Sequence, residues 1–224
     1  MVLIDKVYQK VLAFANKEQR GYITPQEFNL FADQAQSEIF EQYFYDLNQY
    51  ARNLEGSGEY SDIIHNINEK IVAFEKTADI VNGAIVADDL YRLGTVIADG
   101  VTEVQEVQQD EILYINKSPL TKPTDTRPVY VRTGEKTIVT YPAYSYTGTC
   151  TYIKKPSKPN WGYIVLDGKA MFDTVNAVNF ELHQAEENEL VYKILKFAGI
   201  ALQKDIIAKT GQLLEQSQVQ QEKQ

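Results

Sequence analysis

Hydrophobic residues near the start of the chain recur every three or four positions. Within residues 2–15 the recurrence includes Val7 and Val11, and a second run begins at Pro25 and continues to about Arg52. In a helix, this spacing places the apolar side chains on one face and the interleaved polar side chains on the other. The pattern therefore predicts a short amphipathic first helix and a long second helix.

Two further stretches have weaker or later patterns of the same kind. Residues 63–74 show a looser apolar repeat, which fits a third, shorter helix or an extended segment. A clearer apolar repeat consists of Leu190, Ile194, Phe197, Ala198 and Ala201. Acidic residues precede it, and negative charges stabilise the N-terminus of a helix. The glutamine-rich residues 212–224 have few apolar side chains to bury, so we expect a flexible tail.

The middle of the chain, residues 80–163, is rich in β-branched and aromatic residues, which favour strands. The clearest predicted hairpin is residues 128–141, and the proline-containing residues 116–128 before it predict a surface loop. Pairs that contain glycine predict turns between short strands: Asn82-Gly83, Asp99-Gly100, Thr133-Gly134 and Thr147-Gly148.

These patterns together predict an α+β fold. We expect the N- and C-terminal helices, within residues 1–79 and 180–211, to pack into a helical bundle. Residues 80–179 then form a β-hairpin-rich insertion, and residues 212–224 a flexible C-terminal tail.

The segment between the first two predicted helices resembles the calcium loop of an EF-hand. With Gly21 at the sixth loop position, Glu27 falls at the twelfth, where a calcium loop has its bidentate carboxylate. The first, third and fifth positions are then Asn16, Glu18 and Arg20, and the last of these is a cation in a ligand position. A calcium-binding EF-hand-like regulator is therefore the alternative function, and it is the less favoured one.

The same segment can also be interpreted as a helix start that binds no metal. Thr24 and Glu27 have the spacing of a capping box, with Pro25 at the first helical position. Gly21 can take the positive φ that ends the preceding helix. The sequence favours this interpretation, a capped joint between two helices.

Composition narrows the classes of function. The formal charge of −9 over 224 residues, with an isoelectric point near 4.8, argues against a surface that grips nucleic acid. The lone Cys150 cannot form an internal disulfide, and it reads as a small buried or half-buried side chain in a strand. No stretch resembles a secretion signal or a membrane span. We expect a soluble protein of the cytoplasm, or one assembled there into something larger.

Candidate chemistry is sparse. Neither His65 nor His183 has the spaced partners of a zinc protease or a nucleophilic triad. His183 with Glu186 and Glu187 could hold a metal and serve a hydrolase, but such groups at the start of a helix are more often an N-terminal charge cluster. We therefore expect no enzyme activity, no catalytic or metal site and no cofactor.

Fifteen tyrosines accompany a single tryptophan. Tyrosines in the strand-rich middle suit a surface buried against another chain, although an ordinary sheet face explains them about equally well. We predict interface residues Tyr130, Val139 and Tyr141 in the hairpin 128–141. In the tail, Leu213, Leu214 and Val219 are the predicted apolar anchors for docking on a neighbouring protein.

Three segments carry a resemblance to a known family: "NKEQRGYITPQEFNLFADQAQSEIFEQYF" near the start, "DDLYRLGTVIADG" with "RPVYVR" in the middle, and "CTYIKKPSKPNWGY" with "VNFELHQAEENELVYKILKFAGI" near the end. They resemble the neck, or head-tail connector, proteins of crAss-like and related short-tailed bacteriophages, which are akin to tail tubular and adaptor proteins. The resemblance spans most of the chain in the same order.

The resemblance implies a virion structural protein, assembled in the host cytoplasm. It implies a homo-oligomeric ring of twelve copies around the DNA channel, between the portal protein and the adjacent neck or tail rings. Packaged DNA passes through such a ring without specific binding, and an acidic channel suits that passage. On this basis the tail is expected to order only when it docks on the portal.

Overall fold

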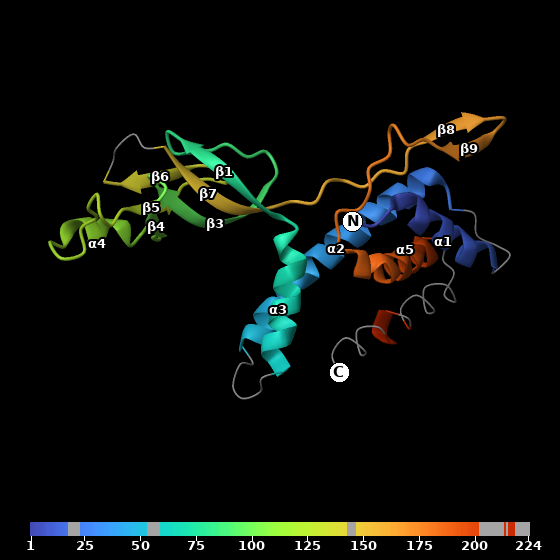
Figure 1. Cartoon of the computed structure of the whole chain (residues 1–224), viewed down its shortest axis with the longest axis horizontal. Coiled ribbons are helices and arrows are strands. Elements are labelled where there is room, and N and C mark those ends of the chain that lie inside the picture. The colour runs from blue at the N-terminus through green and yellow to red at the C-terminus, as the bar shows by residue number, and fades with distance from the viewer. Residues whose placement is uncertain (18–22, 53–58, 143–146, 202–212, 214, 218–224) are drawn as a thin grey trace. The chain divides into compact units, whose positions relative to one another are not determined.

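The structure is a computed structural model that describes residues 1–17, 23–52, 59–142, 147–201, 213 and 215–217. It has an α+β fold and divides into two compact units (Figure 1). One unit, here called the helical unit, combines residues 1–73 with residues 156–224. The other, the strand unit, consists of residues 74–155. The helical unit therefore combines an N-terminal and a C-terminal part of the chain. One continuous internal segment forms the strand unit.

The helical unit is built around its long second helix. Its helices are α1 (Ile4–Lys17), α2 (Pro25–Arg52), α3 (Glu59–Val72), the 3-10 turn η1 (Gln184–Glu186) and α5 (Glu187–Ala201). Helix α2 packs against both α3 and α5, while α1 packs against α5. The fully buried side chains between them include Val7 of α1, Phe28 and Ile39 of α2, and Leu190 and Ile194 of α5. The predicted first, second and last helices are thus confirmed, and residues 63–72 are helical rather than extended.

Extended segments that follow the strand unit in sequence are hydrogen-bonded to amide side chains of α2. Gln36 is buried, donates to the carbonyl of Ser157 at 2.8 Å and accepts the N–H of Glu181 at 3.1 Å. Asn29 accepts the N–H of Trp161 at 2.7 Å. Because each amide both donates and accepts, it can replace the backbone partners that an isolated extended segment lacks.

Trp161 fixes this region to the N-terminal helices. Its ring centroid lies 4.2 Å from that of Tyr8, and its indole N–H donates to Asp5 at 3.0 Å. This packing places the two-stranded ribbon that follows, β8 (Tyr163–Leu166) and β9 (Lys169–Phe172), in the helical unit. The predicted insertion covers residues 80–179, whereas the strand unit begins at Phe74 and ends at Lys155.

The strand unit contains one seven-stranded sheet in the order β2-β1-β7-β3-β4-β5-β6. Neighbouring strands are antiparallel except for the parallel pair β4–β5. A short helix, α4 (Ile112–Lys117), lies between β4 and β5, within a stretch for which no helix was predicted. The strands are β1 (Glu75–Val81), β2 (Ala84–Ile85), β3 (Leu90–Ala98), β4 (Thr102–Glu106), β5 (Val129–Arg132), β6 (Ile138–Tyr141) and β7 (Thr147–Lys154).

The sheet curls until its two edges meet. Ile85 of β2 donates its N–H to the carbonyl of Lys136 at 2.9 Å, and Ile138 of β6 donates to the carbonyl of Gly83 at 2.9 Å. These bonds join the first and last strands of the order, so the sheet is nearly a closed barrel. Closure removes most of the open edge at which another strand could pair.

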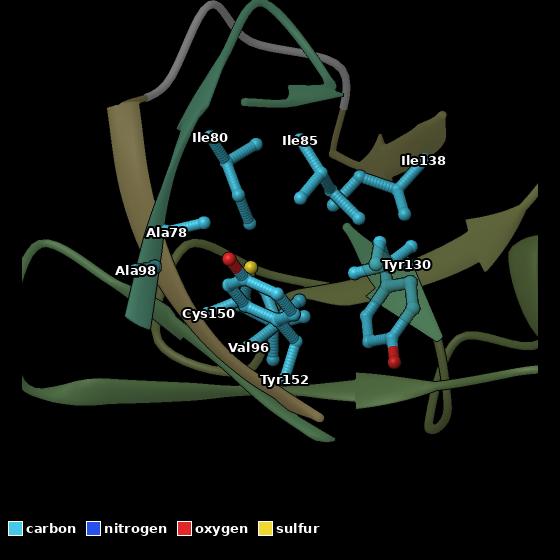
Figure 2. Close-up of a cluster of buried hydrophobic side chains, with 11 residues drawn as sticks. Ala78, Ile80, Ile85, Val96, Ala98, Tyr130, Ile138, Cys150 and Tyr152 are labelled. Carbon is cyan, nitrogen blue, oxygen red and sulfur yellow. The ribbon is translucent and has the colours of Figure 1, made fainter. Parts of the chain in front are cut away.

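The interior of this curled sheet is the core of the strand unit. Figure 2 shows side chains from several strands that point into the enclosed space: Ala78, Ile80, Ile85, Val96, Ala98, Tyr130, Ile138, Cys150 and Tyr152. Cys150 is buried in β7, as predicted. Tyr152 is also buried, and its hydroxyl donates to Asp89 at 2.8 Å, so its polar tip is satisfied at the rim of the core.

Three of the four predicted turns are confirmed. Asn82-Gly83 joins β1 to β2 and Asp99-Gly100 joins β3 to β4, and all four of these residues have positive φ. Gly134 lies in the β5–β6 connection. The prediction for Thr147-Gly148 is wrong, because both residues begin β7, which pairs with β1 on one side and β3 on the other. Backbone hydrogen bonds from two neighbouring strands hold this glycine in an extended conformation.

Candidate functional site

The joint before α2 is a reciprocal capping box. The Glu27 backbone N–H donates to the Thr24 hydroxyl oxygen at 3.3 Å, and the Thr24 N–H donates to Glu27 Oε2 at 2.9 Å. The Thr24 hydroxyl donates to the same carboxylate oxygen at 2.7 Å. These bonds lower the pKa of Glu27, first through the backbone N–H of Thr24 and then through its hydroxyl. The predicted helix cap at Thr24 and Glu27 is confirmed.

The cap bears on the calcium-loop hypothesis. Glu18, Arg20 and Gly21 lie outside the described residues, whereas Asn16, the first position of that loop, belongs to α1. Glu27, the carboxylate that would be bidentate in a calcium loop, has one oxygen taken up by the cap. A calcium ion would have to compete with two hydrogen bonds for that oxygen.

The acidic start of the last helical segment contains the candidate metal ligands His183, Glu186 and Glu187. His183 caps η1, because its Nδ1 accepts the N–H of Ala185 at 3.3 Å. Glu186 is buried, and one of its oxygens lies 2.6 Å from the Lys70 Nζ of α3. These two side chains therefore make separate contacts, and Glu187 makes a third.

Glu187 joins α1 to α5. Its two carboxylate oxygens pair with Lys10 and with Lys6, the latter at 2.9 Å. These hydrogen bonds, that of Lys10 first, lower the pKa of Glu187. Among the described residues, no group of three His, Cys, Asp or Glu side chains is placed to hold a metal ion. Glu186 and Glu187 instead connect helices, through Lys70 of α3 and through Lys6 and Lys10 of α1.

A buried lysine of α5 contacts three carboxylates, one of them in the C-terminal segment. Lys193 is 4% exposed, and its Nζ lies 2.7 Å from Glu215, 3.6 Å from Glu189 and 3.9 Å from Glu38. Lys196 approaches the other oxygen of Glu215 at 3.1 Å. Burial alone would raise the pKa of Glu215, but the hydrogen bonds and charges of the two lysines outweigh it and lower that pKa. Glu215 therefore acts as a clasp between the C-terminal segment and α5.

This contact changes the interpretation of the tail. Gln216 and Ser217 are helical with Glu215, whereas Leu213 is an exposed side chain. Leu214 and Val219, the other predicted anchors, lie outside the described residues. We predicted no packing of this segment on its own subunit, and at Glu215 that is wrong. The sequence pattern missed the contact because a lone glutamate gives no sign of a buried lysine partner on another segment.

A cleft of about 600 Å³ opens between α2, α3 and the start of α5. Acidic side chains outnumber basic ones in its lining, which includes Asp46, Glu69 and Glu186. Lys70 is the lysine in this lining. Lys70 is engaged with Glu186 and lies 5.6 Å from the centre of the Tyr43 ring. The buried carboxylate thus has its counter-ion within the protein. The geometry supplies a concave surface without a defined set of ligand-binding groups.

The predicted interface hairpin is divided between core and surface. Tyr130 is 3% exposed and lies in the core of the strand unit, with its hydroxyl donating to Glu106 at 3.3 Å. It therefore cannot contact another subunit, and its prediction as an interface residue is wrong. Burial and the adjacent carboxylate raise the pKa of Tyr130. Val139 is exposed and Tyr141 half-buried, so both remain accessible, as a contact would require.

The ribbon β8–β9 lies within the predicted strand-rich residues 80–179, although no hairpin is predicted there. Its two strands join through Asp167 and Gly168, both with positive φ, as a two-residue hairpin turn requires. Three consecutive apolar residues of β8, namely Ile164, Val165 and Leu166, are at least half exposed. Only the Asp-Gly pair could have indicated this hairpin from the sequence.

Comparisons with known proteins add no family to this description. No protein-family model matches the chain, and no curated protein matches it significantly. Within the described part of the chain, no helix has both the length and the apolar character needed to cross a lipid bilayer.

Proposed function

We propose that the protein is a virion structural component that forms an oligomeric ring in the neck of a tailed bacteriophage. In this role it connects the portal to the tail and surrounds the channel through which DNA passes. The resemblance of three segments of the sequence to neck proteins of short-tailed phages suggests this role. The same resemblance suggests twelve copies, with the portal and adjacent rings as partners.

The organisation of the chain is the observation that carries the proposal. Helices from both ends of the sequence combine in one unit, and residues 74–155 leave it once to form a separate unit with its own core. In the finer description that we propose, the helices form the bundle of the ring body and the strand unit is its insertion. A subunit with two separate bodies can contact a neighbour with each of them, as the head-to-tail contacts of a ring require.

Accessible apolar side chains support the same proposal. Val139 on the strand unit and Ile164, Val165, Leu166 and Met171 on the helical unit are exposed to between 38% and 64%. Burying such side chains against another chain contributes roughly 25 cal/mol per Å². The net charge of −9 suits a channel lining that repels DNA phosphates rather than binding them.

The direct test is the mass of the assembled protein. Native mass spectrometry and negative-stain microscopy of the purified chain should give closed rings of roughly 300 kDa, twelve times the 25.5 kDa subunit. A chain that remains monomeric at every concentration up to about 1 mM, a weak affinity limit, would contradict the proposal.

A matched pair of variants tests the strand unit in the ring. Val139→Glu should abolish assembly, because a charge would be buried in the contact, whereas the nearly isosteric Val139→Thr should retain it. Both variants should keep the far-ultraviolet circular dichroism of the wild type. Rings that form normally with Val139→Glu would exclude this part of β6 from the interface.

A further inference from the structure

The ribbon β8–β9 has an inner face that rests on the helical unit. Tyr163 and Phe172 face each other across the ribbon, and both rings stack on Trp161, with centroids 6.0 and 5.7 Å away. The Tyr163 hydroxyl also accepts a hydrogen bond from the Gln26 amide of α2 at 3.3 Å. The root of the ribbon is therefore anchored, while Figure 1 shows its tip pointing away from the helices of the unit.

The opposite face of the ribbon is apolar and exposed. Side chains alternate between faces along a strand, so Ile164 and Leu166 lie on the face away from Trp161, together with their partners Met171 and Lys169 of β9. Ile164, Leu166 and Met171 are 50–52% exposed on this face. Val165, on the same face as Tyr163, is 64% exposed near the tip. A two-stranded ribbon is at best marginally stable in water without further packing. This face thus has the character of a contact surface.

Among the described residues, no further strand pairs with either edge of the ribbon. The Asp173 N–H donates to the carbonyl of Gly162 at 2.8 Å, and from this pair the antiparallel register makes every second pair a hydrogen-bonded one. The pair Val165–Ala170 is consequently a non-hydrogen-bonded pair. The backbone N–H and C=O groups of both residues point outward from the ribbon, Val165 on the β8 side and Ala170 on the β9 side, where another strand can pair.

A second copy of this chain is the occupant that fits these edges. In a row of equally oriented ribbons, β9 of one copy runs antiparallel to β8 of the next. Each copy can therefore form backbone hydrogen bonds with both of its neighbours. The ribbon contains Asp167 and Lys169 as its charged residues and is formally neutral in a chain of charge −9. Copies with a large like charge can meet at a neutral segment without strong repulsion.

The large sheet is a poor alternative partner for the ribbon. Its first and last strands are hydrogen-bonded to each other between Ile85 and Lys136. The described edge of β1 that remains open carries Glu75 and Lys76, and charges on an edge discourage strand pairing.

We propose that β8 of one copy pairs edge to edge with β9 of the next, so that the ribbons form a continuous antiparallel sheet with Ile164, Leu166 and Met171 on one side. Closure of this sheet into a ring rests on the proposed function, whereas the pairing itself requires only a second copy. Lys169 of one copy and Asp167 of its neighbour then lie at the same end of the sheet and attract each other.

Two variants with one introduced cysteine each distinguish the pairing geometry. Val165→Cys and Ala170→Cys are prepared separately, mixed and oxidised under native conditions, in which Cys150 is buried. A disulfide forms only between Cα atoms within about 7 Å of each other, so it joins directly paired residues and not equivalent residues of adjacent copies, which lie two strands apart. The mixture should give cross-linked dimers between the two variants, and neither variant alone should do so. Efficient cross-linking of Val165→Cys alone would show a two-fold β8–β8 contact and would overturn the proposal.

A backbone variant tests the hydrogen bonds themselves. Val165→Pro removes an outward N–H without breaking a bond inside the ribbon, because proline is tolerated at such edge positions. It should lose the oligomer, whereas Val165→Thr should keep it, and native Trp161 fluorescence in both would show that the root of the ribbon is intact. If Val165→Pro still forms normal rings and the mixture gives no cross-link, the ribbon contact is refuted but the ring is not. A wild-type chain that stays monomeric at about 1 mM, a weak affinity limit, would refute the ring as well.

Discussion

Replacing Glu215 by glutamine tests whether the C-terminal segment belongs to the stable helical unit. The variant keeps the shape of the side chain and an oxygen that can accept a hydrogen bond, but it removes the charge nearest to the buried Lys193. Lys193 then depends on Glu189 at 3.6 Å and Glu38 at 3.9 Å, of which Glu38 is 42% exposed. The folded state should therefore lose stability.

The magnitude follows from the burial of the pair. The Lys193 and Glu215 side chains are 5% and 16% exposed. Removing one partner of a fully buried ion pair costs about 3–5 kcal/mol, and losing one hydrogen bond to a charged group costs about 1.5–3 kcal/mol. Because two other carboxylates remain near Lys193, we expect the lower range, about 2 kcal/mol, or a melting temperature lower by roughly 4–8 °C.

The pH dependence has a definite sign. The pKa of Glu215 is lower in the folded state than in the unfolded state, so its stabilisation is present above the unfolded pKa near 4.5. It is lost as the pH falls through the folded pKa. The difference between wild type and Glu215→Gln should therefore be full at pH 7 and shrink on acidification below about pH 5.

Urea unfolding followed by fluorescence is the appropriate assay. Trp161 is the single tryptophan of the chain and is buried in the helical unit, so its emission reports on the unit that contains the clasp. Glu38→Gln is the matched control, because an exposed partner at 3.9 Å should cost less than about 0.5 kcal/mol. If Glu215→Gln is as stable as this control, the clasp does not contribute and the reasoning is wrong.

Three further predictions use the same structure. Thr24→Ala should destabilise the helical unit by about 0.5–2 kcal/mol in the urea assay. Calorimetry of the wild type should show no micromolar calcium binding, and tight binding would favour the calcium loop over the cap. Glu187→Gln should flatten the loss of stability below about pH 5, because its lowered pKa makes the wild-type carboxylate stabilising only while it is charged; an unchanged acid limb in circular dichroism would contradict this. Cys150, whose pKa burial raises, should react with a thiol reagent only after unfolding, and rapid labelling of the native protein would exclude its place in the core.

Local signals in the sequence determined the features that depend on neighbouring residues. The capping box needs only Thr24 and Glu27, three positions apart, and the start of α2 follows from it. The turn at Asn82-Gly83 needs only residues that tolerate positive φ. The apolar repeat of the long second helix likewise predicted its bounds, because a helix buries one face wherever that face finds a partner.

Contacts between distant residues decided the rest. The bond from Ile85 to Lys136 closes the sheet and encloses Tyr130, which turned a predicted interface residue into a core residue. The pair Glu215–Lys193 joins residues on different helical segments. No local pattern encodes such partners, because the free energy of these contacts depends on which surfaces the folded chain brings together. The periodicity of a segment fixes which face is apolar, and only the tertiary structure decides what covers that face.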